Sequence, residues 1–243
     1  MEPLVAIRNL TRRYPMNHVG VTALDDVSLD VDRGEFLAIS GPSGSGKSTL
    51  LNLIGCIDRP TSGSIRIESV DTGALAPEPL SKLRRLKIGF VFQTFNLIPV
   101  FTTFENVEYP LLLQKMSAAE RHRRVSEALD SVGLTSRAHH RPDLLSGGER
   151  QRVAVARAVV HRPLLVLADE ATANLDTPNA LQLIALMRKL NRDLAVTFVF
   201  STHDPRLLDQ AGRVVKLCDG RWAGPSKESH EEARHATVLA SRN

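Results

Sequence analysis

Short apolar runs recur along this chain and predict its strands. Runs of about four to eight apolar residues bounded by turn residues are typical of buried strands. A final run is followed by Cys-Asp-Gly and predicts a hairpin around Asp219-Gly220. The predicted strands lie at residues 5–10, 27–31, 36–39, 64–68, 88–92, 164–168, 195–200 and 214–217.

Apolar residues three and four positions apart predict helices between these strands. Residues 50–57 predict one helix, and the pattern becomes helical again from about 94 to 160. Thr177-Pro178 predicts the start of another helix, because proline is favoured at the first helical position. Residues 71–80 contain prolines and are predicted to be irregular.

Three further signals refine this picture. Ser117, followed three residues later by Glu120, predicts a capping box at a helix start. Gly133 predicts the stop of the same helix. Beyond Gly224, residues 225–243 are polar and are expected to form a loosely held tail.

Strands that alternate with helices indicate an α/β fold with a mostly parallel sheet and right-handed crossovers. Ligands of such sheets bind outside the carboxyl ends of the strands. Three polar groups follow predicted strands in this way: residues 41–48, Asp169-Glu170 and residues 201–204. We therefore expect these groups to converge on one pocket.

Composition narrows the class of protein. The 243 residues are 42% hydrophobic and 24% charged, which is ordinary for a globular chain, and the net charge is +4. No window approaches the ~18 consecutive apolar residues of a membrane span, and the N-terminus does not resemble a signal peptide. Cys56 and Cys218 lie far apart in apolar stretches, which predicts buried free thiols in a reducing cytosol.

Two basic clusters carry much of the positive charge, one at residues 82–87 and one at 121–124. Contact with anionic lipid or nucleic acid is one interpretation, and solvated helix faces are the favoured one. Aromatic residues that stack bases are not interleaved with these clusters. No nucleic-acid partner is therefore expected.

Residues 41–48 read Gly-Pro-Ser-Gly-Ser-Gly-Lys-Ser and match the phosphate-binding pattern G-x-x-x-x-G-K-[ST] in full. A predicted strand precedes them and a predicted helix follows, which is the context that this motif requires. The glycines let backbone N–H groups turn inward toward phosphate oxygens. Lys47 supplies a positive charge for the β- and γ-phosphates, and Ser48 supplies a hydroxyl for Mg²⁺.

The predicted strand at 164–168 ends in two carboxylates, Asp169 and Glu170. Successive strand residues point to opposite sides, so the two acids can serve different purposes. Asp169 suits the Mg²⁺ shell of a nucleotide triphosphatase, and Glu170 suits deprotonation of an attacking water. Acidic residues often follow strands without any function, so this pattern is weak evidence by itself. The phosphate loop earlier in the chain is what favours a catalytic and Mg²⁺-binding role for the two acids.

Two more side chains follow predicted strands. His203 comes after the strand at 195–200, where a γ-phosphate would lie, so a hydrogen bond to that phosphate is favoured over an ordinary surface role. Gln93 comes after the strand at 88–92 and has the reach for Mg²⁺ or the attacking water, although its spacing barely distinguishes it from an ordinary loop glutamine.

Residues 145–151 read Leu-Ser-Gly-Gly-Glu-Arg-Gln and lead into a helical run. Ser146 with Gly147 and Gly148 at a helix start forms a second anion-binding device, and a plain N-cap is the alternative. Spacing alone does not explain why one chain has two phosphate sites.

Together these segments resemble the ATP-binding subunit of an ABC transporter, over about residues 4–222. The resemblance implies a P-loop NTPase (RecA-like) core with a small antiparallel β subdomain. It also implies an inserted α-helical subdomain at about 94–160, all within a single ATP-binding domain over 1–224. Members of this family hydrolyse ATP as head-to-tail dimers, in which the signature of one subunit closes over ATP held by the other.

The resemblance assigns roles residue by residue. Tyr14 stacks on adenine, and Asp176 lies in a loop that contacts the second subunit. Gln93 also links the site to a membrane subunit. The phosphate-loop residues implied to hold ATP are Gly41, Pro42, Ser43, Gly44, Ser45, Gly46, Lys47, Ser48 and Thr49, with Ser146, Gly147 and Gly148 acting in trans. The implied catalytic groups are Glu170, His203, Gln93 and Lys47, and the Mg²⁺ ligands are Ser48, Gln93 and Asp169.

Residues 55–63 and 88–99 resemble the lipoprotein-release (LolD-like) and macrolide-export (MacB-like) subgroup. That resemblance implies a permease with a large extracytoplasmic domain and a peripheral location on the cytoplasmic face of the cell membrane. An FtsE-like division ATPase that moves no substrate, a soluble nucleic-acid ABC protein and an inactive nucleotide-binding module are the alternatives. Tandem units and long insertions of the nucleic-acid class are absent from the sequence.

Two substitutions depart from the family pattern near the catalytic glutamate. Ala171 stands where relatives usually have proline, and Ala173 where they usually have glycine or serine. Neither change removes a reacting group, and both bear on the rigidity of the loop after Glu170. Residues 68–80 also fit the family pattern poorly.

Overall fold

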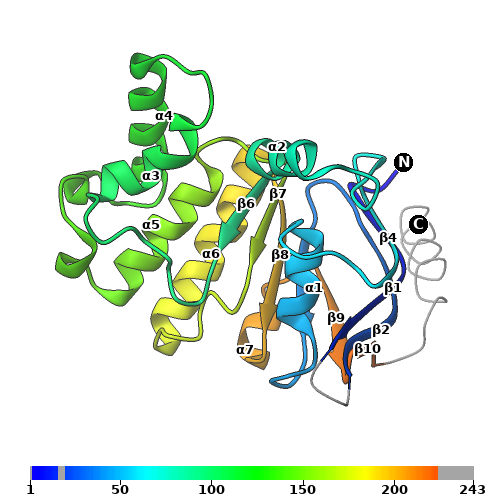
Figure 1. The fold of residues 1–243 in the computed structure, drawn as a ribbon. Coiled ribbons are helices and arrows are strands. Elements are labelled where there is room, and N and C mark those ends of the chain that lie inside the picture. Colours follow the sequence, from blue (N-terminus) through cyan, green and yellow to red (C-terminus); the bar gives the residue numbers. More distant parts are fainter. Residues whose placement is uncertain (1, 16–19, 224–243) are drawn as a thin grey trace, which may run out of the picture.

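The computed structural model describes residues 2–15 and 20–223. A small antiparallel sheet comes first, built from β1 (Val5–Tyr14), β2 (Val21–Val31), β4 (Ser62–Ile67) and β5 (Val70–Asp71) in the order β2-β1-β4-β5. This sheet lies on the right of Figure 1, beside α1 (Lys47–Ile54). The predicted β subdomain is therefore present, and its strands run longer than the apolar runs at 5–10 and 27–31.

A second sheet of six strands forms the centre of the molecule, in the order β10-β9-β3-β8-β7-β6. Its strands pair in parallel from β9 through β6, and only β10 pairs antiparallel. Asp219 and Gly220 both have positive φ, 47° and 75°, which forms the predicted hairpin turn. The bounds are β3 Phe36–Ser40, β6 Ile88–Val91, β7 Leu165–Ala168, β8 Thr197–Thr202, β9 Arg213–Cys218 and β10 Arg221–Trp222.

The central sheet is buried on both faces, as its continuous apolar runs predict. Val166, Phe198 and Phe200 face an apolar cluster shared with the helical side of the molecule. Leu167 and Val199, one residue out of phase, face a second cluster shared with α1 and the antiparallel sheet. The sheet thus separates two hydrophobic layers.

The helical segment lies on the left of Figure 1 and contains α3 (Thr103–Leu112), α4 (Ala118–Ser131) and α5 (Gly147–Val159). Helices α6 (Thr177–Leu194) and α7 (Pro205–Leu208) follow β7 and β8. Short 3-10 turns at Thr135–Arg137 and Pro142–Leu144 connect α4 to α5. Helices therefore occupy much of the predicted range 94–160.

Two predictions about local structure were wrong. Residues 71–80 include the start of a helix, α2 (Pro77–Lys87), where irregular chain was predicted. Its prolines lie in the first turn, where the missing N–H groups have no intrahelical partner anyway. The capping box at α4 is incomplete: the Ser117 hydroxyl accepts from the Glu120 N–H, but the Glu120 carboxylate pairs with Arg123 and Arg124.

The two cysteines are free. Cys56 is buried, as predicted, and burial raises the pKa of its thiol to about 11. Cys218 is only half-buried, because it lies next to the turn of the β9–β10 hairpin. Among the described residues, no helix has the length and apolarity to cross a membrane. The predicted tail at 225–243 lies outside the described residues.

Candidate nucleotide-binding and catalytic site

The phosphate loop links β3 to α1, and its shape requires glycine at two points. Gly41 has a φ of 153°, and a Cβ there would lie 2.1 Å from the Leu217 carbonyl oxygen. Gly46 has a φ of 102°, and a Cβ there would lie 2.4 Å from the Ala23 carbonyl oxygen. Only glycine fits backbone that turns this way and lies this close to neighbouring strands.

The start of α1 has no side-chain cap, in contrast to the starts of α3, α4, α5 and α6. Side chains of Thr102, Ser117, Ser146 and Asp176 cap α3, α4, α5 and α6. Helix α1 has Gly46 at its N-cap and no side-chain cap, so its first N–H groups point outward unsatisfied. Uncapped N–H groups and the helix dipole together suit a phosphate.

Two buried groups of the loop also fit a nucleotide. The Ser45 hydroxyl oxygen is buried and has no hydrogen-bond partner among the described residues. The Lys47 ammonium is 4% exposed and is held 2.9 Å from both the Gly41 and the Pro42 carbonyl oxygens. A buried cation at the mouth of an uncapped helix matches a polyphosphate ligand. Ser48, by contrast, is exposed.

The three polar groups that follow strands do converge. One carboxylate oxygen of Glu170, Oε1, lies 3.5 Å from Lys47 Nζ and 3.5 Å from His203 Nδ1. These residues come from the ends of β7, β3 and β8, which are neighbours in the sheet. The predicted convergence at the carboxyl ends of the strands is therefore present, with Glu170 between the phosphate-loop lysine and the histidine.

Ser201 belongs to the polar group at 201–204 that was expected to converge here, but its own role, to organise the two carboxylates, was not predicted. Its hydroxyl donates to Asp169 Oδ1 at 2.7 Å and accepts from the Glu170 backbone N–H at 2.9 Å. The parallel register of β7 and β8 pairs Ala168 with Phe200, so Ser201 lies one step beyond that pair, beside Asp169. The pairing register was the signal that sequence alone did not supply.

The loop after Glu170 is held by hydrogen bonds despite Ala171 and Ala173. The Ala173 N–H donates to the Glu170 carbonyl oxygen at 3.0 Å, and Ala171 is 6% exposed within the helical-side core. Asn174 Nδ2 donates to the Gln93 carbonyl oxygen at 2.9 Å. Gln93 itself is exposed at this junction, while its backbone is tied to the loop after Glu170.

Helix α5 is bound to the loop that carries Gln93. The guanidinium of Arg157 donates to the Asn96 carbonyl oxygen at 2.6 Å and to the Phe95 carbonyl oxygen at 2.7 Å. Gln151 Nε2 donates to the Phe92 carbonyl oxygen at 3.3 Å. Burial lowers the pKa of Arg157 from its usual value. The helix that starts with Ser146-Gly147-Gly148 is therefore bound directly to this loop.

The start of α5 carries a full capping box. The Ser146 hydroxyl accepts from the Glu149 N–H, and the Glu149 carboxylate accepts from the Ser146 N–H. These contacts leave the N–H groups of Gly147 and Gly148 without an intrahelical partner. In Figure 1, α5 and α1 lie on opposite sides of α6, β7 and β8, and the cavity that Gly148 borders is lined by no residue of the phosphate loop.

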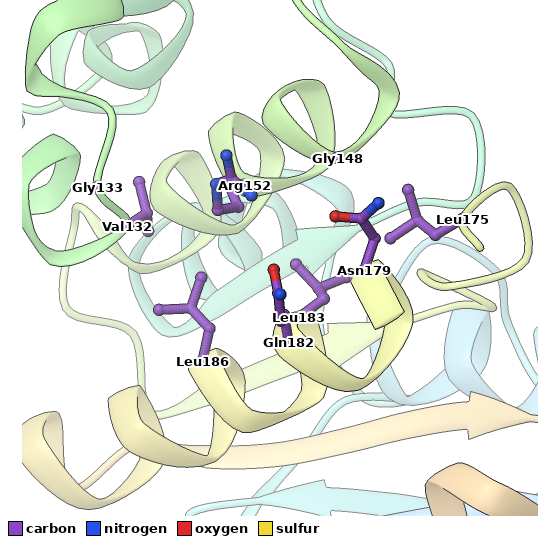
Figure 2. A pocket seen from close by; sticks show the side chains of 9 residues that line it. All are labelled: Val132, Gly133, Gly148, Arg152, Leu175, Asn179, Gln182, Leu183 and Leu186. Carbon is purple, nitrogen blue, oxygen red and sulfur yellow. The ribbon is translucent and has the colours of Figure 1, made fainter. Parts of the chain in front are cut away.

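A cavity of about 310 Å³ lies between α5 and α6. Figure 2 shows its wall, which combines Gly148 and Arg152 of α5 with Asn179 of α6. Leu175, next to Asp176, completes the rim on that side. Asp176 itself caps α6 by accepting from the Asn179 N–H at 2.9 Å. Gly148 and Leu175, the neighbour of Asp176, thus border the same cavity.

Tyr14 lies at the end of β1 and is half-buried. Its hydroxyl donates to Asp58 Oδ2 at 2.8 Å, and the Arg12 guanidinium lies 4.4 Å from the centre of its ring. Asp58 belongs to the segment that follows α1. The ring therefore connects the antiparallel sheet to the helix that begins at the phosphate loop.

The basic cluster at 121–124 is neutralised locally, as expected of a solvated helix face. Arg121 pairs with Glu108 at 2.8 Å, and Arg123 and Arg124 pair with Glu120 at 2.8 and 2.7 Å. Hydrogen bonds from Arg123 and then Arg124 lower the pKa of Glu120 to about 2. In the cluster at 82–87, Lys87 pairs with Glu68 at 3.3 Å.

Comparison with known proteins decides the family. The model of a family described as ABC transporter matches residues 24–173. The chain belongs to the ABC transporter family. Since its ATP-binding cassettes hydrolyse ATP, this chain is an ABC-type ATPase, and both its phosphate loop and its fold agree with that.

Two named relatives of this cassette cover most of its length. A lipoprotein-releasing system ATP-binding protein, LolD, of Anaeromyxobacter dehalogenans is 47% identical, over 93% of this chain and 96% of that protein. A macrolide export ATP-binding/permease protein, MacB, of Burkholderia thailandensis is 42% identical over 99% of this chain. The chain spans only 37% of that MacB protein.

A solved structure confirms the cassette fold. The ATP-binding cassette of Methanocaldococcus jannaschii, in a dimeric post-hydrolysis state bound to ADP and Pi, superposes with a TM-score of 0.84. The two chains are 44% identical, and the match covers 92% of this cassette and 98% of that one. The mixed α/β architecture predicted from sequence is therefore confirmed.

Proposed function

We propose that this ATPase cleaves ATP with Glu170 as general base and drives a membrane permease. The observation that carries the catalytic assignment is the placement of Glu170 Oε1 3.5 Å from both Lys47 Nζ and His203 Nδ1. A carboxylate in this position accepts a proton from a water that attacks the γ-phosphate, while Lys47 and His203 hold the phosphate oxygens.

Mg²⁺ fits the remaining donors. Asp169 supplies a carboxylate fixed by Ser201 at 2.7 Å, and Ser48 supplies an exposed hydroxyl at the start of α1. No cluster of three or more metal-binding side chains occurs among the described residues. A Mg²⁺ site does not require such a cluster, because the ion is usually held by one or two carboxylates together with substrate phosphates and water. Gln93 is assigned as a further ligand.

We assign the second anion site to a second copy of this chain. The uncapped start of α1 and the start of α5 face different regions of one molecule, so a head-to-tail pair is needed to bring them to one nucleotide. The dimeric state of the Methanocaldococcus jannaschii cassette supports this arrangement. In such a pair Ser146, Gly147 and Gly148 contact the partner's ATP, and Asp176 lies at the contact between subunits.

The permease partner is assigned to the export or lipoprotein-extraction class, with a large extracytoplasmic domain. Support comes from the names of the relatives, one a lipoprotein-releasing subunit and the other a macrolide exporter with its permease in the same protein. The hydrogen bonds from Arg157 to the loop after Gln93 would transmit a movement of α5 during dimer closure to this loop, which contacts the permease in the proposed assembly. The subunit would then lie peripherally on the cytoplasmic face of the membrane.

Capture of the partner tests this proposal. A Glu170→Gln variant with ATP and Mg²⁺ should hold the closed dimer and co-purify a permease with a large extracytoplasmic domain, identified by mass spectrometry. The matched control is a Lys47→Ala, Glu170→Gln double variant, which should not close. Division-site proteins in the eluate would favour an FtsE-like signalling role, and the absence of any membrane protein would contradict transport.

A further inference from the structure

The ring of Tyr14 is fixed from two directions by one pair of charged residues. Asp58 Oδ2 accepts from its hydroxyl at 2.8 Å, and the Arg12 guanidinium lies 4.4 Å from the ring centre. Arg12 Nη2 in turn donates to Asp58 Oδ1 at 2.9 Å. The three side chains form a closed triangle, so neither the tilt nor the position of the ring can change without breaking a contact.

This triangle ties the ring to the helix of the phosphate loop. Asp58 lies four residues after α1 ends, and α1 begins at Lys47. The following residues are also held to β1: the Thr61 N–H donates to the Thr11 carbonyl oxygen at 2.9 Å, and the Arg13 N–H donates to Thr61 Oγ1 at 3.0 Å. One end of α1 therefore faces the phosphates, while the chain beyond its other end holds the aromatic ring.

We propose that Asp58 and Arg12 are positioning residues that hold Tyr14 at a fixed distance from the phosphate loop, ready to stack on the nucleotide base. This inference rests on the proposed role of Tyr14 under adenine. An aromatic ring that is already immobile loses little conformational entropy when a ligand binds, so the same stacking contact gives tighter binding. Arg12 covers one face of the ring, and the base takes the other.

The triangle also defines how the base is recognised. The Tyr14 hydroxyl proton and the Arg12 Nη2 group are both committed to Asp58. The Tyr14 ring therefore offers the base its face and no free hydroxyl proton. Stacking on an aromatic ring is tolerant of base identity, so ADP and GDP should depend on the triangle to the same extent.

Nucleotide binding to the full chain tests the proposal. ADP, GDP and pyrophosphate are titrated with Mg²⁺ by isothermal calorimetry into the wild type and into Tyr14→Phe, Tyr14→Ala and Asp58→Ala. Tyr14→Phe removes only the hydroxyl, so it still tests the contact with Asp58 if Asp58→Ala folds poorly. Asp30→Ala is the matched control, because Asp30 also pairs with an arginine of β1, Arg8, but at an exposed site.

We expect Tyr14→Phe and Asp58→Ala each to raise the Kd for ADP and for GDP about 3- to 10-fold. The Kd for pyrophosphate should stay within about two-fold, since a base-free ligand does not touch the ring. A Tyr14→Phe, Asp58→Ala double variant should bind ADP no more weakly than the worse single variant, because Asp58→Ala already breaks the contact that Tyr14→Phe removes. Asp30→Ala should bind all three ligands as the wild type does.

Three results would overturn the inference. If Tyr14→Ala weakens ADP binding but Tyr14→Phe and Asp58→Ala do not, the ring binds the base without help from Asp58 and Arg12. The proposed role of Tyr14 beneath adenine would then remain supported. If Tyr14→Ala also leaves ADP binding unchanged, that base site is wrong as well. If pyrophosphate binding weakens in parallel with ADP binding, the triangle supports the fold and not the base.

Discussion

At the scale of single residues, Glu170 holds an unusual backbone conformation. Its φ is 43°, in the left-handed region, which costs about 1 kcal/mol or more for a residue other than glycine. The hydrogen bond from its N–H to Ser201 Oγ at 2.9 Å holds this conformation in place. The result is a carboxylate directed at Lys47 and His203. Ala171 in place of the usual proline does not prevent this geometry.

Replacement of Glu170 by glutamine should separate binding from turnover. An amide cannot accept a proton from water, so we expect kcat for ATP hydrolysis to fall at least about 100-fold. ATP binding should persist, because the phosphate loop and Lys47 are unchanged. The measurement is steady-state phosphate release together with the equilibrium affinity for ATP.

Glu68→Gln is the matched control for this experiment, since Glu68 pairs with Arg33 and Lys87 on the surface of the antiparallel sheet. Its turnover should equal that of the wild type. Full turnover by Glu170→Gln would contradict the role of general base.

At the scale of elements, the loop between β6 and α3 depends on a helix from another layer. Phe95 and Asn96 both have positive φ, 61° and 48°, which is unfavourable for residues with side chains. Their carbonyl oxygens accept from one half-buried guanidinium, that of Arg157 on α5. Hydrogen bonds from a charged group offset this strain, at about 1.5–3 kcal/mol each.

Arg157→Met should therefore loosen the loop without unfolding α5. We expect amide hydrogen exchange over residues 93–98 to become at least about ten-fold faster, because two charge-assisted hydrogen bonds are lost. Exchange within α5 should change little, since methionine is a good helix former and keeps much of the apolar stem. Mass spectrometry of the exchanged peptides reports both regions.

Arg124→Met is a suitable comparison, because Arg124 pairs with a carboxylate of its own helix, Glu120. It should leave exchange of the 93–98 loop unchanged. Equal protection of this loop in Arg157→Met and the wild type would show that Arg157 does not hold it.

At the scale of the whole molecule, the central sheet separates two apolar cores. His161 lies where the end of α5 approaches β6, and it is 8% exposed. Neither ring nitrogen has a hydrogen-bond partner among the described residues. Burial lowers the pKa of His161 to about 4, and the nearby Ile88 backbone opposes this shift only weakly.

This burial predicts a loss of stability in mild acid. The unfolded chain takes up a proton on His161 near pH 6.5, whereas the folded protein does so only near pH 4. The unfolded state thus binds more protons between these values, and the free energy of unfolding should fall by up to about 3 kcal/mol as pH decreases from 6.5 to 4.

A His161→Phe variant isolates this effect, because phenylalanine keeps a flat ring of similar shape but does not titrate. Urea unfolding at several pH values should show a weaker pH dependence for His161→Phe than for the wild type between pH 6.5 and 4. Identical pH dependence in the two proteins would mean that His161 does not remain neutral in the fold.

Local sequence determined the features that lie within one continuous segment. The phosphate loop, its flanking strand and helix, the hairpin at Asp219-Gly220 and the cap at Ser146 each depend on neighbouring residues alone. The apolar runs also fixed which strands are buried on both faces. Helix α2 was not predicted because prolines such as Pro77 and Pro79 normally interrupt a helix. A helix accepts proline in its first turn, and the sequence did not show that these two prolines lie there.

Tertiary structure decided which distant residues meet. The position of Ser201 beside Asp169 follows from the register of β7 and β8, and the contact of Tyr14 with Asp58 follows from the return of the chain along β1 after α1. The sequence contains each of these residues but not the sheet order that places them. Contacts of this kind depend on strand pairing and helix packing across the whole chain, so no local pattern encodes them.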